Sequence, residues 1–208
     1  MESSYFLAFK SKGADFCNSN LVDGVFYGCN FEGCNFDNAK LNESNIDLGS
    51  FVNCSFVGSE IMNSVVYESR ISNCSFKYTN LSGTSLNYYM NQGNIPLLNL
   101  NFEGAVLKNF SLEISSYTEY NTRDPLVSLF TRRNLIHLTL DNPFLLVKEL
   151  NLNLKNATVN EKTKIGNNLL TEKIAVKLGC VWCPALVIEE FGLISEYRNR
   201  MNRDFMNE

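Results

Sequence analysis

The stretch ADFCNSNLVDGVFYGCNFEGCNFDNAKL, residues 14–41, places a large apolar residue at every fifth position. The same phase continues without a polar interruption, and a small residue always stands two positions earlier. A helix with about 3.6 residues per turn, or a strand alternating by about two, cannot present this series on one continuous face. The chain must therefore turn a corner every five residues. The residues of this phase are Phe16, Leu21, Phe26, Phe31, Phe36, Leu41, Ile46, Phe51, Phe56, Ile61, Val66, Ile71, Phe76, Leu81 and Leu86.

Short motifs within this stretch resemble the A(D/N)LXX unit of the pentapeptide-repeat family, for example Ala14-Asp15-Phe16, Cys29-Asn30-Phe31 and Thr79-Asn80-Leu81. The resemblance covers residues 14–88 and implies a right-handed quadrilateral β-helix in which four units form one coil. Residues twenty apart then stack directly. The expected fold class is mainly β, with a small α-helical subdomain after the β-helix.

The regular phase ends after Leu86. The following segment NYYMNQGNIPLL, residues 87–98, contains a glycine and a proline, which predict a projecting loop. The phase resumes, shifted by one residue, at Phe102 and Leu107. Residues 5–9 are expected to fold over the first coil as an N-terminal cap. The sequence thus predicts a first domain over residues 1–114, with its loop at 87–98.

From about Ser115 the signals become helical. The pair Asn142-Pro143 is typical of a capped helix start, and Thr158 and Glu161 have the spacing of a capping box. The second of these helices is expected to run to about Leu178, and another to begin near Pro184. Residues 115–208 are therefore predicted to form a C-terminal helical subdomain.

The charge and the termini limit the classes of partner. Residues 1–115 carry 11 acidic and 6 basic side chains, and the remainder carry 11 and 12, which adds to the net charge of −4. Without a basic patch, direct binding of nucleic acid is not expected. No Sec signal peptide and no membrane span are recognised. Seven cysteines without such a signal indicate reduced thiols in a cytosolic compartment. The resemblances described below imply the bacterial cytoplasm or secretion into a host cell.

The cysteines and the single histidine could carry a chemical role, but we favour a structural role for each of them. The repeat cysteines occupy the small inward position, where a thiol behaves as a small buried hydrophobe. Cys180 and Cys183 have the spacing of half a zinc site or of a redox dithiol, but no second pair accompanies them. His137, the single histidine, lies between apolar residues and fits a core or interface position. No catalytic residue, cofactor or metal is expected.

Tyr88, Tyr89 and Met90 in the predicted loop are residue types that dominate binding interfaces, and they equally suit a cap over the coil edge. The leading hypothesis is therefore a non-catalytic protein–protein interaction module, whose oligomeric state the sequence leaves open. A zinc or redox enzyme centred on Cys180 and Cys183 is the hypothesis from a different class.

Two resemblances suggest the kind of protein partner. The order of β-helix and then helices around Asp141-Asn142-Pro143-Phe144 resembles the front half of HECT-like ubiquitin-ligase effectors delivered by type III secretion. That resemblance implies virulence, a host protein partner and, at most, a substrate-binding fragment of a ligase. The alternative is a resemblance to quinolone-resistance pentapeptide proteins, which occupy the DNA site of gyrase as duplex mimics and imply a bacterial topoisomerase as partner.

Overall fold

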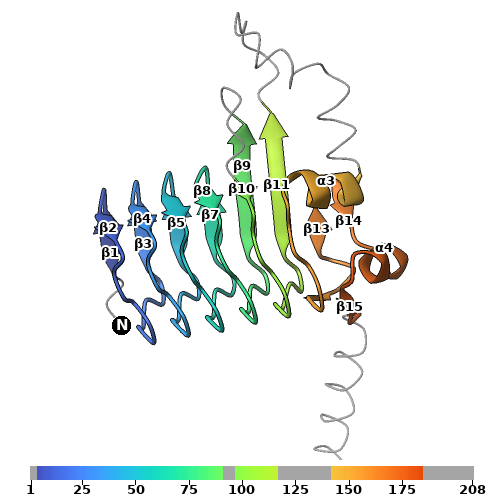
Figure 1. Ribbon diagram of the computed structural model, residues 1–208, viewed down its shortest axis with the longest axis horizontal. Helices are drawn as coiled ribbons and strands as arrows, with labels where there is room; N and C mark the ends of the chain where they lie inside the picture. Colours follow the sequence, from blue (N-terminus) through green and yellow to red (C-terminus); the bar gives the residue numbers. More distant parts are fainter. Residues whose placement is uncertain (1–3, 91–96, 117–141, 185–208) are drawn as a thin grey trace, which may run out of the picture.

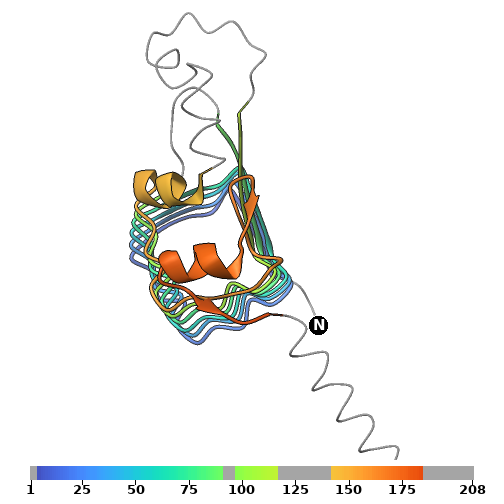
Figure 2. The ribbon, with the colours of Figure 1, turned by 90° about the vertical axis from the view of Figure 1, so that its right-hand side faces the viewer.

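The computed structural model describes residues 4–90, 97–116 and 142–184 (Figure 1). Short strands turn around a common axis and build a β-solenoid of about seven turns. Viewed along that axis, the coils superpose in a four-sided outline (Figure 2). The mainly β pentapeptide-repeat fold expected from the fivefold period is therefore confirmed.

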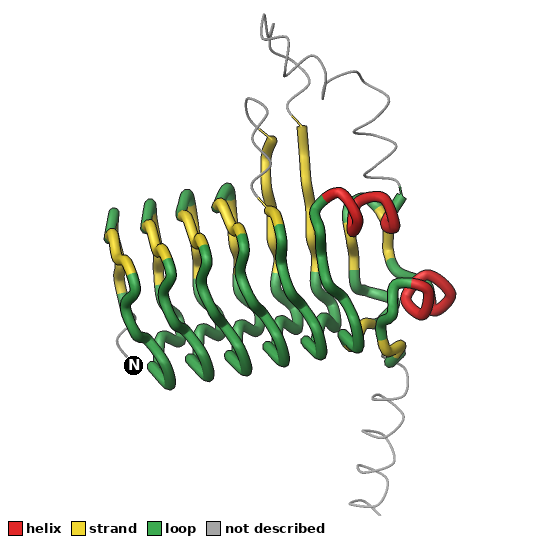
Figure 3. Tube along the Cα trace, in the orientation of Figure 1, coloured by secondary structure: helices red, strands yellow, loops and turns green. Residues whose placement is uncertain are grey.

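Two sheets form two neighbouring sides of the solenoid, and their strands are yellow in Figure 3. The eight-stranded sheet is parallel except at its last pair, and its order is β1 (Tyr5–Leu7), β3 (Val25–Tyr27), β5 (Asn45–Asp47), β7 (Val65–Tyr67), β9 (Ser85–Met90), β11 (Ser111–Ser116), β13 (Lys164–Ile165) and β14 (Asn168–Leu169). The five-stranded sheet has the order β10 (Leu97–Leu98), β8 (Arg70–Ser72), β6 (Ser50–Val52), β4 (Asn30–Glu32) and β2 (Lys10–Lys12). A small third sheet pairs β12 (Thr158–Val159) with β15 (Val181–Trp182).

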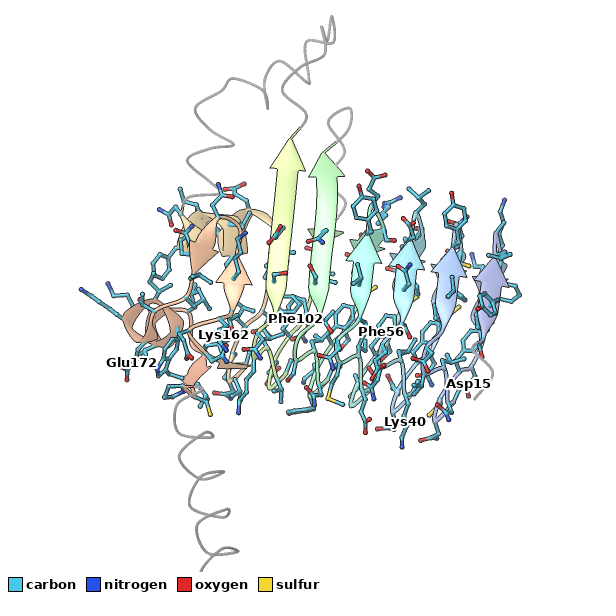
Figure 4. The ribbon with its side chains drawn as sticks, turned by 180° about the vertical axis from the view of Figure 1, so that it is seen from behind. Asp15, Lys40, Phe56, Phe102, Lys162 and Glu172 are labelled. Atoms are coloured by element: carbon cyan, nitrogen blue, oxygen red, sulfur yellow. The ribbon has the colours of Figure 1, made fainter. Side chains whose placement is uncertain are left out.

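The inward residues stack from coil to coil. In the regular coils the register is twenty residues, so that Phe26 lies opposite Ile46 and Ile46 opposite Val66. Fourteen of the fifteen inward residues of the fivefold phase are buried, and Phe16 near the N-terminal end is half-buried. The rings of Phe36, Phe56 and Phe76 are stacked with centroids 4.9 Å apart, which is the spacing of hydrogen-bonded strands. Phe102 continues this column at 5.3 Å from Phe76; Figure 4 labels Phe56 and Phe102.

The small inward residues bond to the backbone of the coil before them. The Ser64 hydroxyl donates to the Leu41 carbonyl at 2.8 Å, and the Cys54 thiol donates to the Phe31 carbonyl at 3.5 Å. Because a buried polar group without a partner is costly, these bonds allow hydroxyls and thiols to occupy the core.

Asparagines hold many of the corners. Fifteen described residues other than glycine have a positive φ, and nine of them are asparagines, which tolerate the left-handed conformation better than most residues. Asn53, Asn73, Asn99 and Asn151 stack at one corner, where the amides of the last three each donate to the amide oxygen of the coil before at 2.6–3.1 Å. The high asparagine content of the chain therefore follows from its corners.

The coil length changes twice. Ser85 pairs with Ser111, and Ser111 pairs in turn with Lys164, so extra residues are inserted into both coils. Both insertions follow strands of the eight-stranded sheet, β9 and β11, which run for six residues and pair along their whole length. The loop predicted from residue 87 is therefore wrong for Asn87–Met90, which extend β9 because β11 pairs with them.

The solenoid also continues beyond residue 114. Asn101 pairs with Asn153 and Val106 with Thr158, so part of the region expected to be helical adds coil instead. The helix predicted from Thr158 to Leu178 is wrong: Thr158 begins β12, and its backbone N–H donates to the Ala105 carbonyl at 2.8 Å. Stacking on the preceding coil outweighs the capping-box spacing.

Two short helices accompany these last coils. As the Asn-Pro pair predicts, α3 (Pro143–Glu149) begins after Asn142, whose side chain accepts from the Phe144 and Leu145 N–H groups at 3.1 and 3.3 Å. α4 (Glu172–Lys177) lies across the C-terminal end of the coils and buries Ala175 (Figure 2). Within the described segments, no helix is long and apolar enough to span a membrane. The helix expected from Pro184 lies almost wholly outside them.

The N-terminal end has a different construction. Residues 5–9 do not fold over the first coil, because Tyr5–Leu7 form β1 in register with β3, and the Phe6 ring stacks on that of Phe26 at 4.8 Å. β1 and β2 are the edges of their sheets, and no described residue pairs with their outer sides. This segment is the first coil itself.

Phe56→Asp is expected to unfold the chain, because it places a carboxylate without a partner between the Phe36 and Phe76 rings. Phe56→Ala should lower the free energy of unfolding by about 3 to 5 kcal/mol. Circular dichroism during thermal unfolding measures both. Phe56→Leu is the control and should fold, since leucine fills the equivalent inward position at Leu41. A folded aspartate variant with unchanged melting would contradict the register.

Asn73→Ala is expected to destabilise the solenoid by about 1 to 2 kcal/mol, because it breaks two amide contacts and leaves alanine at a φ of 54°. Asn73→Gly removes the same contacts without the conformational cost, so its stability should lie between those of Asn73→Ala and the parent chain. Urea unfolding gives the order. Equal stability of all three proteins would show that the asparagine column contributes nothing.

Candidate binding surface

The eight-stranded sheet presents an exposed apolar and aromatic surface. In each three-residue strand the middle residue points inward, so the flanking two point outward. The outward pairs of β1, β3 and β7 are large and apolar, and Tyr5, Tyr27 and Tyr67 are 69%, 49% and 37% exposed. We call this surface the tyrosine face, and it consists of Tyr5, Leu7, Val25, Tyr27, Asn45, Asp47, Val65 and Tyr67.

A polar row divides the tyrosine face. β5 places Asn45 between Val25 and Val65, and Asp47 between Tyr27 and Tyr67. The Oδ1 atom of Asp47 is buried and has no hydrogen-bond partner. Since buried polar atoms in folded proteins nearly always have a partner, this oxygen requires an explanation beyond folding.

Over the first five coils, the charge on this side of the solenoid is of one sign; farther along the same sheet, Lys164 of β13 forms an ion pair with Glu113 of β11. The segments of the first five coils on this side, 4–8, 22–28, 42–48, 62–68 and 82–87, contain Asp23, Glu43, Asp47 and Glu68, and they contain no lysine or arginine. The acidic residues surround or interrupt the apolar strands. An apolar patch with an acidic border is typical of a site that binds a partner with apolar and cationic groups.

The five-stranded sheet is more polar. A hollow of about 500 Å³ lies over β2, β4 and β6 and is lined by residues that include Lys10, Lys12, Glu32 and Val52. Lys12 and Glu32 form an exposed ion pair at 3.0 Å, a kind of contact that contributes little. The residues that line the hollow include two serines, Ser11 and Ser50, but no histidine. Its geometry does not indicate catalysis.

The residues singled out for partner binding lie beside the tyrosine face. Tyr88, Tyr89 and Met90 are the second half of β9 and pair in register with Ile114, Ser115 and Ser116 of β11. Their backbone therefore belongs to a strand pair that reaches past the shorter strands of the sheet (Figure 1). Sequence reasoning missed the tyrosine face itself; its signal was the twenty-residue spacing from Tyr27 to Asp47 to Tyr67.

The cysteines are separated by the fold. Cys29, Cys34, Cys54, Cys74 and Cys180 are buried, and Cys17 and Cys183 are half-buried. Burial raises the pKa of Cys29, and it raises that of Cys180 to about 11. The hydrogen bond with Cys54, followed by burial, raises the pKa of Cys74. Raised pKa values keep these three thiols neutral and unreactive near neutral pH.

The Cys180 and Cys183 pair does not form a metal centre with its described surroundings. Cys180 donates to the Leu154 carbonyl at 3.7 Å, and the Cys183 N–H donates to the Val159 carbonyl at 2.8 Å. Trp182 between them packs against the core. Within residues 4–90, 97–116 and 142–184, no three histidine, cysteine or acidic side chains gather as a metal site. His137 lies outside the described residues.

A thiol-reactive disulfide reagent is expected to label Cys17 and Cys183 rapidly in the native protein, and the five buried cysteines only after unfolding. The physical reason is burial, together with the raised pKa values of Cys29, Cys74 and Cys180. Peptide mapping by mass spectrometry identifies the labelled sites. Rapid native labelling of Cys74 would contradict the closed core.

Known proteins share the repeat. Residues 12–47 match the family model described as Pentapeptide repeats, with 8 copies. The solved structure of HetL, a pentapeptide repeat protein involved in heterocyst differentiation regulation from the cyanobacterium Nostoc sp. strain PCC 7120, is similar at 13% identity and a TM-score of 0.28, over 56% of each chain. Full-length QnrB1, a plasmid-mediated fluoroquinolone resistance protein, is similar at 13% identity and a TM-score of 0.44, over 91% of this chain and 98% of that one.

The chain thus spans 56% of the length of HetL. No curated protein sequence matches it. The family match covers the coils that contain β2 to β5. The later coils stack on these in the same register. Residues 12–47 are therefore similar to pentapeptide repeats, and the chain folds as a β-solenoid in which the same stacking continues.

Proposed function

We propose that the protein is a non-catalytic binding module that docks a protein partner on the tyrosine face. The observation that carries this proposal is the exposed row of tyrosine, valine and leucine side chains on one side of a rigid solenoid, bordered by acidic residues. Tyrosine is enriched at interfaces because it adds a large apolar area and a polar hydroxyl at low entropic cost. A stacked β-helix also supplies a surface that needs little ordering on binding.

Two classes of partner follow from the resemblances in the sequence. A host protein is the proposed partner if the chain is a secreted effector. α3, which begins at Asn142-Pro143, lies within the last coils of the solenoid and adds no support to that order of elements. A bacterial topoisomerase is the alternative, with quinolone protection as the outcome. A pull-down from eukaryotic lysate and a gyrase supercoiling assay separate the two classes.

Val65→Lys is expected to weaken partner binding by about thirtyfold, because it puts a charge in the middle of the tyrosine face. Val181→Lys is the matched control: both valines lie on strands, they are 43% and 50% exposed, and the charge change is the same. A protein captured by the parent chain is purified, and its Kd is measured with each variant. Equal weakening by both variants, or none by Val65→Lys, would contradict docking on this face.

A further inference from the structure

Tyr27, Asp47 and Tyr67 stand in one outward column on three successive coils. We propose that these three side chains form a receptor for a guanidinium group, specifically an arginine side chain of the partner. This inference rests on the proposed function, because it names the chemistry of the group that the tyrosine face accepts. The residues above and below the column, Leu7 and Asn87, are neutral, so Asp47 is its one charge.

The carboxylate of Asp47 has no structural task within the described residues. Its Oδ1 atom is buried and has no hydrogen-bond partner. The other positions of the same outward column hold the uncharged residues leucine, tyrosine and asparagine, so the fold does not require a carboxylate there. An unpaired carboxylate oxygen removed from water destabilises a fold. Asp47 as a whole is half-buried, so a cation from outside the chain can approach its carboxylate, offset the unpaired charge and turn this cost into binding free energy.

The spacing of the two rings suits a planar cation. Coils repeat at about 4.8 Å, so the backbones that carry Tyr27 and Tyr67 lie about 9.6 Å apart, with Asp47 midway. A cation held over Asp47 is then within the ~6 Å from each ring at which a cation–π contact is favourable. A guanidinium is planar, stacks on aromatic faces and presents two parallel N–H groups to a carboxylate, whereas an ammonium is a compact, strongly hydrated charge.

No basic group of the described chain fills this position. The five segments on this side of the solenoid, 4–8, 22–28, 42–48, 62–68 and 82–87, contain no lysine or arginine. The next cation along the chain, Arg70, lies on β8 of the other sheet, and the ion pairs among described residues do not include it. The acidic neighbours Asp23, Glu43 and Glu68 add a field that attracts a cation.

The test uses the full chain and two fluorescein-labelled peptides, one of alternating glycine, serine and arginine, the other with lysine in place of each arginine. Fluorescence anisotropy at about 0.15 M salt measures Kd, so that long-range charge effects are screened. The arginine peptide should bind at least about tenfold more tightly than the lysine peptide. Asp47→Asn should weaken the arginine peptide by about tenfold or more, and Tyr27→Leu should weaken it as well.

Glu172→Gln is the matched control, because it removes the same charge from α4 at the other end of the solenoid (Figure 4). It should leave the Kd unchanged. Asp47→Asn should melt at the same temperature as the parent chain or higher, since it removes an unpaired charge, and this shows that lost binding is not lost folding.

Three results would overturn the inference: equal affinity for both peptides, unchanged binding by Asp47→Asn, or equal weakening by Glu172→Gln. These results differ from a failure of the proposed function. If Val65→Lys blocks a purified partner while Asp47→Asn does not, the tyrosine face stands as a docking surface and the guanidinium receptor is wrong.

Discussion

In-register stacking of one coil on the next is the constraint on which the rest of this structure depends. The Leu21 N–H donates to the Lys40 carbonyl at 2.7 Å, the Leu41 N–H to the Glu60 carbonyl at 2.7 Å, and the Ile61 N–H to the Asn80 carbonyl at 2.8 Å. Because each coil bonds to its neighbours in this way, an inward side chain always meets another inward side chain at the strand spacing. The apolar phase, the small positions and the asparagine corners are three consequences of that one repeat.

Where this constraint acts, the sequence predicts the structure well. The fivefold phase indicates which residues face inward, and the grouping by twenty predicts the column of Phe36, Phe56 and Phe76. Prediction fails where inserted residues lengthen the coils that follow β9 and β11, because a fixed period no longer relates stacked positions. Thr158 then looks like a helix start, although its partner is Val106 on the preceding coil, far away in the sequence.

The sequence does not reveal the tyrosine face, for a related reason. Outward positions are not constrained by the core, so Leu7, Tyr27, Asp47, Tyr67 and Asn87 share no residue type even though they share a column. Only the register, once known, brings them together. The start of α3 is predictable for the opposite reason. Asn142 and Pro143 are adjacent in the sequence, so they predict the helix start without knowledge of the fold.

The freedom of the outward positions also explains how this fold can retain a destabilising residue. A solenoid gains its stability from the stacked interior, and the flanking residues of each strand contribute less to it. The unpaired Oδ1 atom of Asp47 therefore weakens one row of the surface without disturbing the Ile46 side chain beside it, which is buried on the opposite face of β5. Since two tyrosines flank that carboxylate, and the outward segments of the first five coils on this side carry no basic residue, Asp47 costs stability while it prepares a site for a cation that the described residues do not supply.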